Sequence, residues 1–309
     1  MIDIYKLGGN EGKGSIRAVL NPKLKEKIND SIKRLKRYGF FKDFCKNTKT
    51  NYSTLWKYLN KTTYIPLYIL KELEELSNIK FQQHVKDLKY GTGATKRKTK
   101  AVQSLSEEFA AIIGAFIADG HLKERIVFWN NRKAIHYELV FREEYESNMR
   151  ALAKWLNKIF EINIKPKKEK NHYSIYISNK IIFRYFTNIF GFKSGRKTET
   201  VEIPEIFYKS SDKIKKAVAK GILMFDGSVS RKIGYIELYS KSRNLIIGIS
   251  KLMKELNVNP GYISLNPDKY GRCRIIIRKK EELNKSLEFF EPETEKYIRL
   301  KKILETFKR

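Results

Sequence analysis

The stretch FAAIIGAFIADGHL, residues 109–122, has a second copy downstream, AVAKGILMFDGSVS, residues 217–230. Each copy carries a glycine, then four mostly apolar residues, then an Asp-Gly pair: Asp119-Gly120 in the first and Asp226-Gly227 in the second. At this chain's content of glycine and aspartate, the pattern is expected by chance about 0.02 times. Finding it twice, with the aspartates 107 residues apart, indicates an internal repeat.

The residues after each copy show the same alternation of hydrophobic periods. Each half reads as a helix ending in Asp-Gly, two strands, a helix, two more strands and a closing helix. The expected strands are 125–129, 136–142, 162–167 and 172–178 in the first half, and 233–240, 260–266 and 273–279 in the second. Helices are expected at 146–160 and 179–190. The sequence therefore predicts an α+β fold with two pseudo-symmetric αββαββα halves, 105–200 and 201–309.

The composition points to a polyanionic partner. Lys and Arg total 64 against 34 Asp and Glu, a net charge of +30, which favours nucleic acid. A membrane is excluded, because the longest apolar run, residues 109–118, is about half of a bilayer span. Two unpatterned cysteines indicate a reducing compartment. We therefore expect a cytoplasmic, nucleoid-associated protein, or an organellar matrix protein if the source is eukaryotic.

The first 95 residues form a separate region, with 23 basic and 9 acidic residues in the first hundred. Apolar periodicity predicts an all-α domain. A short helix, a turn and a second helix near residues 40–59 resemble helix-turn-helix domains of the phage-repressor type. In that resemblance Ser53, Thr54 and Lys57 face the major groove; a generic helical bundle is the alternative. Residues 96–104, in a stretch rich in Lys, Thr and Gly, are interpreted as a basic linker.

Small residues recur every four positions in the repeated stretch. Gly114 and Gly221 occupy the same place in the two copies, and this spacing lets two helix backbones approach closely. We expect the two helices to cross side by side. The glycine after each aspartate is predicted to adopt the left-handed conformation that ends helices sharply.

The two aspartates close their helices, where the helix dipole is negative and a carboxylate is disfavoured. If the helices cross, Asp119 and Asp226 emerge at the same end and repel each other unless a positive charge lies between them. A divalent cation between the two carboxylates would remove this repulsion, and Mg²⁺ binds a few carboxylates together with water and phosphate oxygens. Such a site suits hydrolysis of a phosphodiester.

At these residues, IIGAFIADG (112–120) and AKGILMFDG (219–227), the chain resembles the LAGLIDADG homing endonuclease family. The resemblance covers residues 105–309. It implies a monomer whose motif helices form the core between two saddle-shaped antiparallel sheets, and which cuts both strands of a DNA target site. By position, Asp119 and Asp226 would be the catalytic acids, holding Mg²⁺ together with Gly120 and Gly227. Mn²⁺ or Ca²⁺ could take the place of Mg²⁺ as a substitute that does not support cleavage.

The resemblance also places a pocket lysine near the metals. Lys241 occupies that place in the second half and would polarise the attacking water. Arg142 is its counterpart in the first half.

Strand alternation leaves one face of each expected sheet apolar and the other rich in Arg, Tyr and His, as readout in a DNA groove requires. The residues expected to contact DNA from this face are Arg125, His136, Arg142, His172, Tyr176, Tyr235, Tyr239, Arg272, Arg274 and Arg278.

Some motif positions depart from the family. Ile117 and Met224 stand where the family often has an acid, and Phe225 and Lys220 weaken the symmetry of the second copy. Both aspartates are nevertheless present, which favours an active enzyme, encoded in an intron or as a free-standing gene. Two alternatives stay open on the same fold: a transcription regulator that binds DNA without cutting, and a maturase that binds intron RNA.

Overall fold

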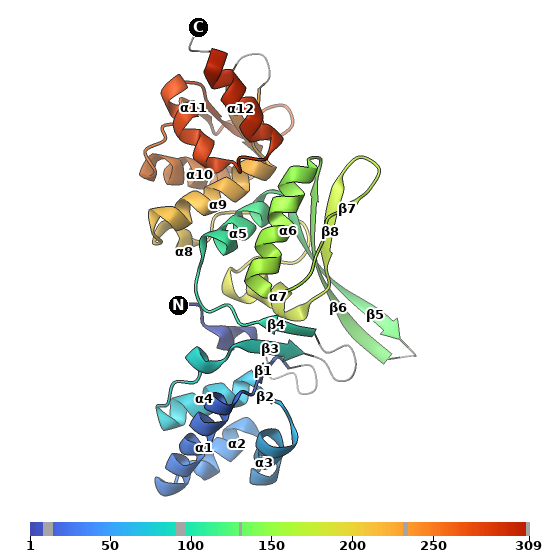
Figure 1. Cartoon of the computed structure of the whole chain (residues 1–309), viewed down its shortest axis with the longest axis vertical. Helices are drawn as coiled ribbons and strands as arrows, with labels where there is room; N and C mark the ends of the chain where they lie inside the picture. Colours follow the sequence, from blue (N-terminus) through green and yellow to red (C-terminus); the bar gives the residue numbers. More distant parts are fainter. Residues whose placement is uncertain (9–14, 91–96, 130–131, 231–233, 307–309) are drawn as a thin grey trace. The chain divides into compact units, whose positions relative to one another are not determined.

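The computed structural model describes residues 1–8, 15–90, 97–129, 132–230 and 234–306 (Figure 1). The chain falls into two compact units. One comprises residues 1–104 and 179–189, and the other comprises residues 105–178 and 190–309. Both LAGLIDADG-like stretches lie in the second unit.

The second unit contains two halves that share the order helix, two strands, helix, two strands. The first half consists of α5 (Glu107–Asp119), β5 (Gly120–Trp129), β6 (Arg132–Glu143), α6 (Glu146–Phe160), β7 (Lys167–Lys168) and β8 (Tyr173–Ile177). The second consists of α8 (Glu205–Tyr208), α9 (Asp212–Phe225), β9 (Ser228–Val229), β10 (Ile236–Ser240), α10 (Arg243–Glu255), β11 (Tyr262–Ser264), β12 (Cys273–Ile277), α11 (Lys280–Ser286), η5 (Leu287–Phe289) and α12 (Glu295–Thr306).

The two sheets share one antiparallel topology. Their strand orders are β5-β6-β8-β7 and β9-β10-β12-β11, so each strand of the first sheet has a counterpart at the same place in the second. The register follows the predicted alternation: Phe141 pairs with Ile175 in one sheet, and Leu238 pairs with Ile275 in the other, and all four side chains are buried. The predicted α+β fold of two related halves is confirmed.

Helices α5 and α9 pack against each other through glycine (Figure 1). A Cβ atom on Gly114 would lie 2.2 Å from the carbonyl oxygen of Val218, and one on Gly221 would lie 2.2 Å from that of Ala111. Only glycine allows backbones this close, so the predicted crossing of the two helices is confirmed. Because both helices run towards their Asp-Gly ends, the crossing also places those ends in one region.

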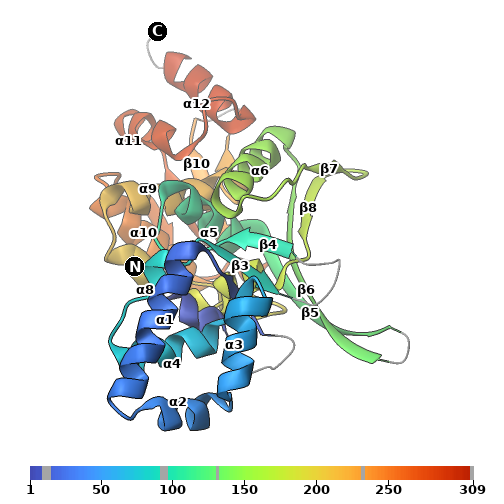
Figure 2. The ribbon, with the colours of Figure 1, turned by 60° about the horizontal axis from the view of Figure 1, so that its bottom comes forward.

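The first unit combines helices with a sheet. Its elements are η1 (Ile4–Leu7), β1 (Arg17–Val19), α1 (Pro22–Arg37), α2 (Phe41–Thr48), α3 (Tyr52–Lys61), β2 (Tyr64–Pro66), α4 (Leu67–Ser77), η3 (Gln82–His84), β3 (Asp87–Tyr90) and β4 (Arg97–Lys100), together with α7 (Lys180–Arg184) and the π-helical turn η4 (Tyr185–Ile189). Figure 2 shows the four helices α1–α4. The strands form an antiparallel sheet in the order β2-β1-β3-β4.

This sheet corrects two predictions. The expected all-α domain is mixed, because strands of three or four residues are too short to show an alternating pattern in the sequence. The expected linker 96–104 contains β4, which pairs with β3 through backbone hydrogen bonds that its Lys- and Thr-rich side chains do not reveal. Residues 91–96, including the first linker residue, lie outside the described residues.

The segment expected as one helix over 179–190 is α7 followed by η4, and it completes the first unit. Tyr185 is fully buried there. Its hydroxyl accepts a hydrogen bond from the backbone N–H of Val102 (2.7 Å) and donates one to the Val102 carbonyl (3.1 Å). The Asn179 amide donates to the hydroxyl of Thr99 (2.9 Å). The first unit therefore extends past residue 95 and includes a segment of the first repeat.

Of the strand expected at 162–167, only Lys167 lies in a strand, the two-residue β7 at the edge of its sheet. Among the described residues, no helix combines the length and the apolar character that crossing a bilayer would require.

Candidate active site

The two motif aspartates stand at the ends of the crossing helices. Asp119 is the last residue of α5, and Asp226 is the C-cap of α9. Gly120 follows with extended backbone angles (φ −78°, ψ 151°), and Gly227 has no positive φ. The predicted left-handed caps are therefore wrong. Glycine is needed at 120 for space instead, because a Cβ there would lie 2.2 Å from the Phe116 ring.

The surroundings disfavour two negative charges. Burial raises the pKa of Asp226 to about 7, and the charge of Asp119 raises it further. Burial raises the pKa of Asp119 as well, while the ammonium groups of Lys197 and Lys296 partly offset this shift. Desolvation of a carboxylate, with added repulsion from a neighbouring acid, produces such shifts. The helix ends therefore form a region that a positive charge would stabilise.

Two lysines occupy equivalent places at these helix ends. Lys197 donates from Nζ to the carbonyl oxygens of Ile117 and Ala118, the latter at 2.9 Å. Lys296 donates to the carbonyl oxygens of Met224 (2.6 Å) and Phe225 (3.1 Å). In each repeat the acceptors are the two residues before the aspartate. Each ammonium group therefore satisfies the last carbonyls of one motif helix and compensates its negative dipole.

Both ammonium groups are costly to bury. Desolvation lowers the pKa of Lys197 to about 8, although Asp226 and Asp119 favour its charged form. Desolvation likewise lowers the pKa of Lys296, against the favourable charges of Glu143, Asp119 and Asp226. A lysine with a lowered pKa beside paired carboxylates is typical of functional sites.

Each lysine is held by a segment tied to the strand after the motif. Before Lys197, Gly195 adopts a positive φ of +95° and donates its N–H to the carbonyl of Leu122 (3.0 Å). Lys296 lies on α12, where Arg299 donates to the carbonyl of Val229 (3.1 Å). Leu122 and Val229 both stand three residues after the motif aspartate, so the two anchors are equivalent.

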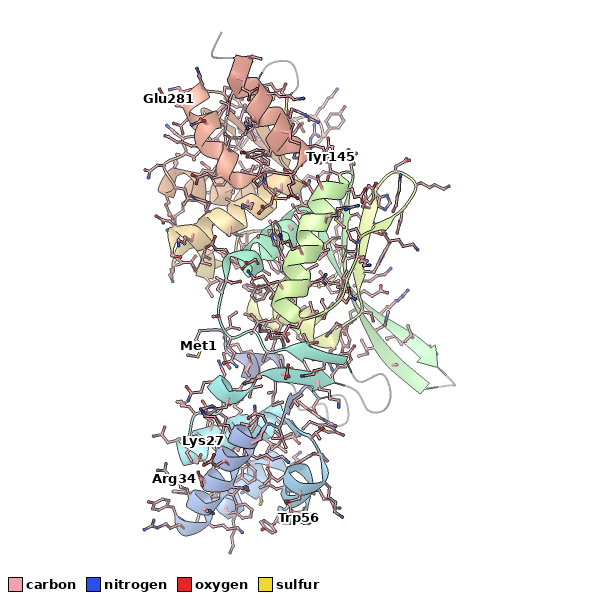
Figure 3. All side chains as sticks on the ribbon, in the orientation of Figure 1. Met1, Lys27, Arg34, Trp56, Tyr145 and Glu281 are labelled. Carbon is pink, nitrogen blue, oxygen red and sulfur yellow. The ribbon has the colours of Figure 1, made fainter. Side chains whose placement is uncertain are left out.

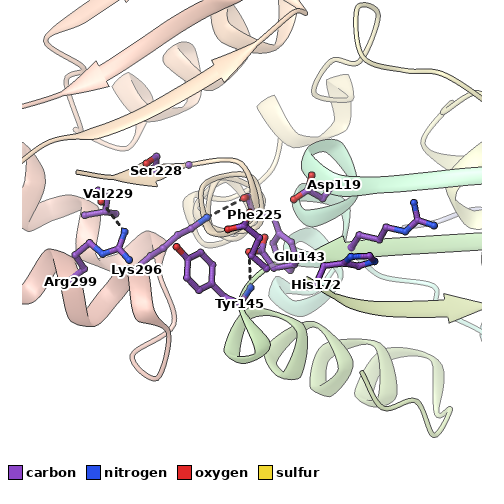
Figure 4. A pocket seen from close by; sticks show the side chains of 12 residues that line it. Asp119, Glu143, Tyr145, His172, Phe225, Ser228, Val229, Lys296 and Arg299 are labelled. Carbon is purple, nitrogen blue, oxygen red and sulfur yellow. Dashed lines mark hydrogen bonds between the residues drawn. The ribbon is translucent and has the colours of Figure 1, made fainter. Parts of the chain in front are cut away.

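A pocket of about 490 Å³ opens beside Asp119 (Figure 4). Its wall brings together residues from both repeats: Asp119, Arg142, Glu143, Glu144, Tyr145, His172, Phe225, Gly227, Ser228, Val229, Lys296 and Arg299. Glu143 is a third acid at the site. It is 7 % exposed, and burial raises its pKa to about 7.

Of the predicted basic residues, Arg142 lines this pocket, whereas Lys241 does not. Lys241 is exposed directly after β10. Sequence reasoning misses the lysines that the helix ends do hold, Lys197 and Lys296. Lys197 lies in a loop with no periodic pattern, 78 residues after Asp119, and Lys296 lies on a charged helix, 70 residues after Asp226. Because the two spacings differ, no repeat in the sequence signals these lysines.

The outward face of the second sheet carries stacked guanidinium groups and rings. The pairs, measured from Cζ to ring centroid, are Arg272 over Tyr239 (4.6 Å) and Tyr270 (4.8 Å), Arg274 over Tyr262 (5.1 Å) and Arg278 over Tyr235 (5.6 Å). Such stacking holds long arginine side chains in defined positions.

The outward face of the first sheet is organised by hydrogen bonds and ion pairs among its polar side chains. Arg125 donates to Glu138 (2.9 Å), and Ser178 Oγ lies 2.8 Å from His136 Nε2. A second group links Arg142 to the Tyr176 hydroxyl (3.4 Å), and His172 lies 2.9 Å from Glu169. The predicted DNA-contacting residues therefore share the outward faces, but those of the first sheet are partly neutralised.

Residues 108–203 and 215–294 match the family described as WhiA LAGLIDADG-like domain. The match covers more than half of the chain, and the chain belongs to this family.

Two curated proteins are similar to the chain. A protein of the A-type ATP synthase from Pyrococcus abyssi (strain GE5 / Orsay) is 28% identical over 163 residues, 52% of this chain and 15% of that protein. A DNA polymerase of Thermococcus hydrothermalis is 25% identical over 180 residues, 58% of this chain and 10% of that protein. The chain thus spans only a small part of these relatives.

Two solved structures are similar to the chain at low identity. I-DmoI in complex with DNA and Mn is 18% identical, with a TM-score of 0.45, covering 60% of this chain and 97% of that one. Full-length DUF199/WhiA from Thermatoga maritima is 16% identical, with a TM-score of 0.44. The similarity covers 68% of this chain and 63% of that one.

Proposed function

We propose that the protein is a divalent-metal-dependent endonuclease that cuts double-stranded DNA at a specific site. One observation carries the proposal: the ends of α5 and α9 present two aspartates and two lysines, Lys296 buried and Lys197 half-buried, in the same relation to each helix. A structural role alone does not require this pairing, because burial raises the pKa of both acids and desolvation lowers the pKa of both lysines. A site built for a reaction tolerates that cost.

The acids fit a divalent cation. Asp119 and Asp226 supply two carboxylates in surroundings that disfavour both charges, and a cation between them would relieve the repulsion. Mg²⁺ needs only one or two carboxylates when water and phosphate complete its shell. When bound, it would supply Lewis-acid stabilisation of phosphate charge and activation of water. Gly120 and Gly227 would leave room beside the acids.

The chain's own groups would act on the phosphate around this centre. The ammonium groups of Lys197 and Lys296 would stabilise negative charge that develops during cleavage, from positions already fixed by two backbone carbonyls each. Because both repeats lie in one chain, a monomer would present both centres. The Arg- and Tyr-rich sheet faces would hold the duplex, with phosphate contacts for position and base contacts for sequence.

Replacing either lysine with methionine should abolish most cleavage while leaving binding nearly unchanged. Loss of one preorganised positive group is expected to lower the cleavage rate by about 100-fold or more. The rate would be measured with nicked and linear plasmid products, and binding by gel shift. Lys241→Met, at the exposed predicted lysine, is the matched control. A greater loss with Lys241→Met than with Lys197→Met would return the role to Lys241.

The proposed activity is tested by selecting a cleaved target from a deep random plasmid library in the presence of Mg²⁺. Recovery of one cut sequence supports the proposal. A protein that binds DNA tightly and cuts nothing would instead be a non-cleaving regulator. That alternative is favoured by one observation: the described residues contain no group of three or more His, Cys, Asp or Glu side chains placed to hold a metal. Preference for intron RNA over any duplex would identify a maturase.

The first unit is proposed as a second DNA-binding element. A three-residue turn joins α2 to α3, and Asn51 caps α3 by accepting from the N–H of Thr54 (2.8 Å). Ser53 and Lys57 are exposed on α3, as is Trp56, which is labelled in Figure 3. This arrangement is consistent with helix-turn-helix readout in the major groove.

If α3 lies in a groove, Lys57→Ala should weaken DNA binding and lower the salt dependence by about one phosphate contact. Lys71→Ala is the control, because Lys71 is exposed on α4 and pairs with Glu75 on the same helix. Affinity would be measured over a range of salt concentrations. An unchanged slope for Lys57→Ala would assign the α3 surface to another partner.

A further inference from the structure

The equivalence of the two helix ends is broken at one position. Glu143 is the last residue of β6, two residues before Tyr145, the N-cap of α6. Ser240 is the last residue of β10, two residues before Ser242, the N-cap of α10. The two residues thus hold the same place in the two repeats. One is an acid and the other a neutral hydroxyl.

The acid faces only one of the two lysines. Glu143 and Lys296 line the same pocket, 7 % and 6 % exposed respectively (Figure 4). Glu143 is the strongest of the three acids favouring the charged form of Lys296, whereas Lys197 feels only Asp226 and Asp119. The carboxylate of Glu143 accepts from the N–H of Tyr145 (3.2 Å), which holds it at the pocket wall. The ammonium of Lys296 therefore has a third acid facing it, in addition to the two aspartates that it shares with Lys197.

We propose that Glu143 is a positioning residue that makes the two cleavage centres unequal, with the centre served by Lys296 the slower one. The inference rests on the proposed endonuclease function. A buried carboxylate beside the ammonium competes with the incoming phosphate for its positive charge, and it repels the phosphate itself. The centre without Glu143 then cuts its strand of the target first, and the centre that contains Glu143 cuts the other strand later.

The experiment measures the two strands separately, on the full chain, with a target labelled differently on each strand. Lys296→Met identifies the strand cut by its centre. The wild type should cut that strand more slowly than the other. Glu143→Ser, which installs the residue of the other repeat, should speed that cut by on the order of tenfold and leave the other strand within about twofold. Ser240→Glu should slow the opposite strand.

A gain of rate confined to one strand cannot arise from damage to the fold, and Glu143→Gln removes the charge while keeping the volume. Equal effects on both strands, or no effect on either, would overturn the inference while leaving the endonuclease function intact. Nuclear magnetic resonance of labelled lysine side chains gives a readout without cleavage: Glu143→Gln should shift the Lys296 ammonium signal and not that of Lys197. Equal shifts would overturn the pairing even if the wild type cuts no DNA.

Discussion

Asp119→Asn and Asp226→Asn should each abolish cleavage, keep DNA binding and raise the stability of the metal-free protein. Cleavage is lost because each change removes one of the two carboxylates at the joined helix ends. Binding persists because the sheet faces are untouched. Stability rises because asparagine removes a charge that burial disfavours at both positions and that Asp119 disfavours further at position 226. For Asp226→Asn, the gain is expected to be on the order of 2 kcal/mol near neutral pH, allowing for water in the pocket.

The pH dependence of stability has a definite sign. The folded state raises the pKa of Asp226 to about 7 from an ordinary value near 3.8, so it binds a proton more tightly than the unfolded chain does. The contribution of Asp226 to the stability of the metal-free protein should therefore fall as pH rises from about 4 to about 7. Glu143, with a pKa also near 7, adds a loss of the same sign. Asp226→Asn should flatten this slope, and added Mg²⁺ should oppose it in the wild type.

Thermal unfolding across this pH range, with and without Mg²⁺, is the measurement. Asp212→Asn is the control, since Asp212 lies exposed in the first turn of the same helix α9, where a negative charge is favourable. The Asp212→Asn variant should be slightly less stable than the wild type and should still cleave DNA. Retained cutting by Asp119→Asn or Asp226→Asn would remove these residues from the active site.

The repeat and its fold can be predicted because their signals are periodic. The pairing of Gly114 with Gly221 follows from small residues at helical spacing, and the core positions Leu139 and Leu238 follow from strand alternation. The aspartates stand out because a repeated acid at a helix end has no structural reason to be there. In each case a local rule recurs at a fixed interval along the chain.

The lysines could not be predicted, because tertiary contacts alone select them. Lys197 is one of many lysines in the chain, and nothing in GRK, residues 195–197, distinguishes it until Gly195 bonds to the carbonyl of Leu122. Lys296 likewise gains its place from the packing of α12. Lys241 is predicted from the register of a strand. The lysines that contact the helix ends lie instead in the segments that follow the last strand of each sheet. The strands of the first unit escape prediction for a related reason, since their partners are distant in sequence.

Gly114→Ala and Gly221→Ala should each cause a large loss of stability, although alanine is the better helix former by about 1 kcal/mol. An added Cβ would lie 2.2 Å from a backbone carbonyl of the partner helix in both cases, and backbone cannot rotate away. The helices must separate, with a cost of about 3 kcal/mol or more. The separation would also displace the aspartates and lysines at the helix ends, so cleavage should fall even below the unfolding temperature.

Gly248→Ala in α10 provides the matched control. Its Cβ would lie too close only to the hydroxyl of Tyr208, at 2.4 Å, with Ile203 at an ordinary contact distance of 3.5 Å, and the hydroxyl end of a side chain can move aside. Chemical denaturation should therefore show Gly248→Ala within about 1 kcal/mol of the wild type, and both crossing variants far below it. Near-wild-type stability for Gly114→Ala would mean that α5 and α9 are not in backbone contact. The shared site would then lose its physical basis, because that contact alone brings the two Asp-Gly ends together.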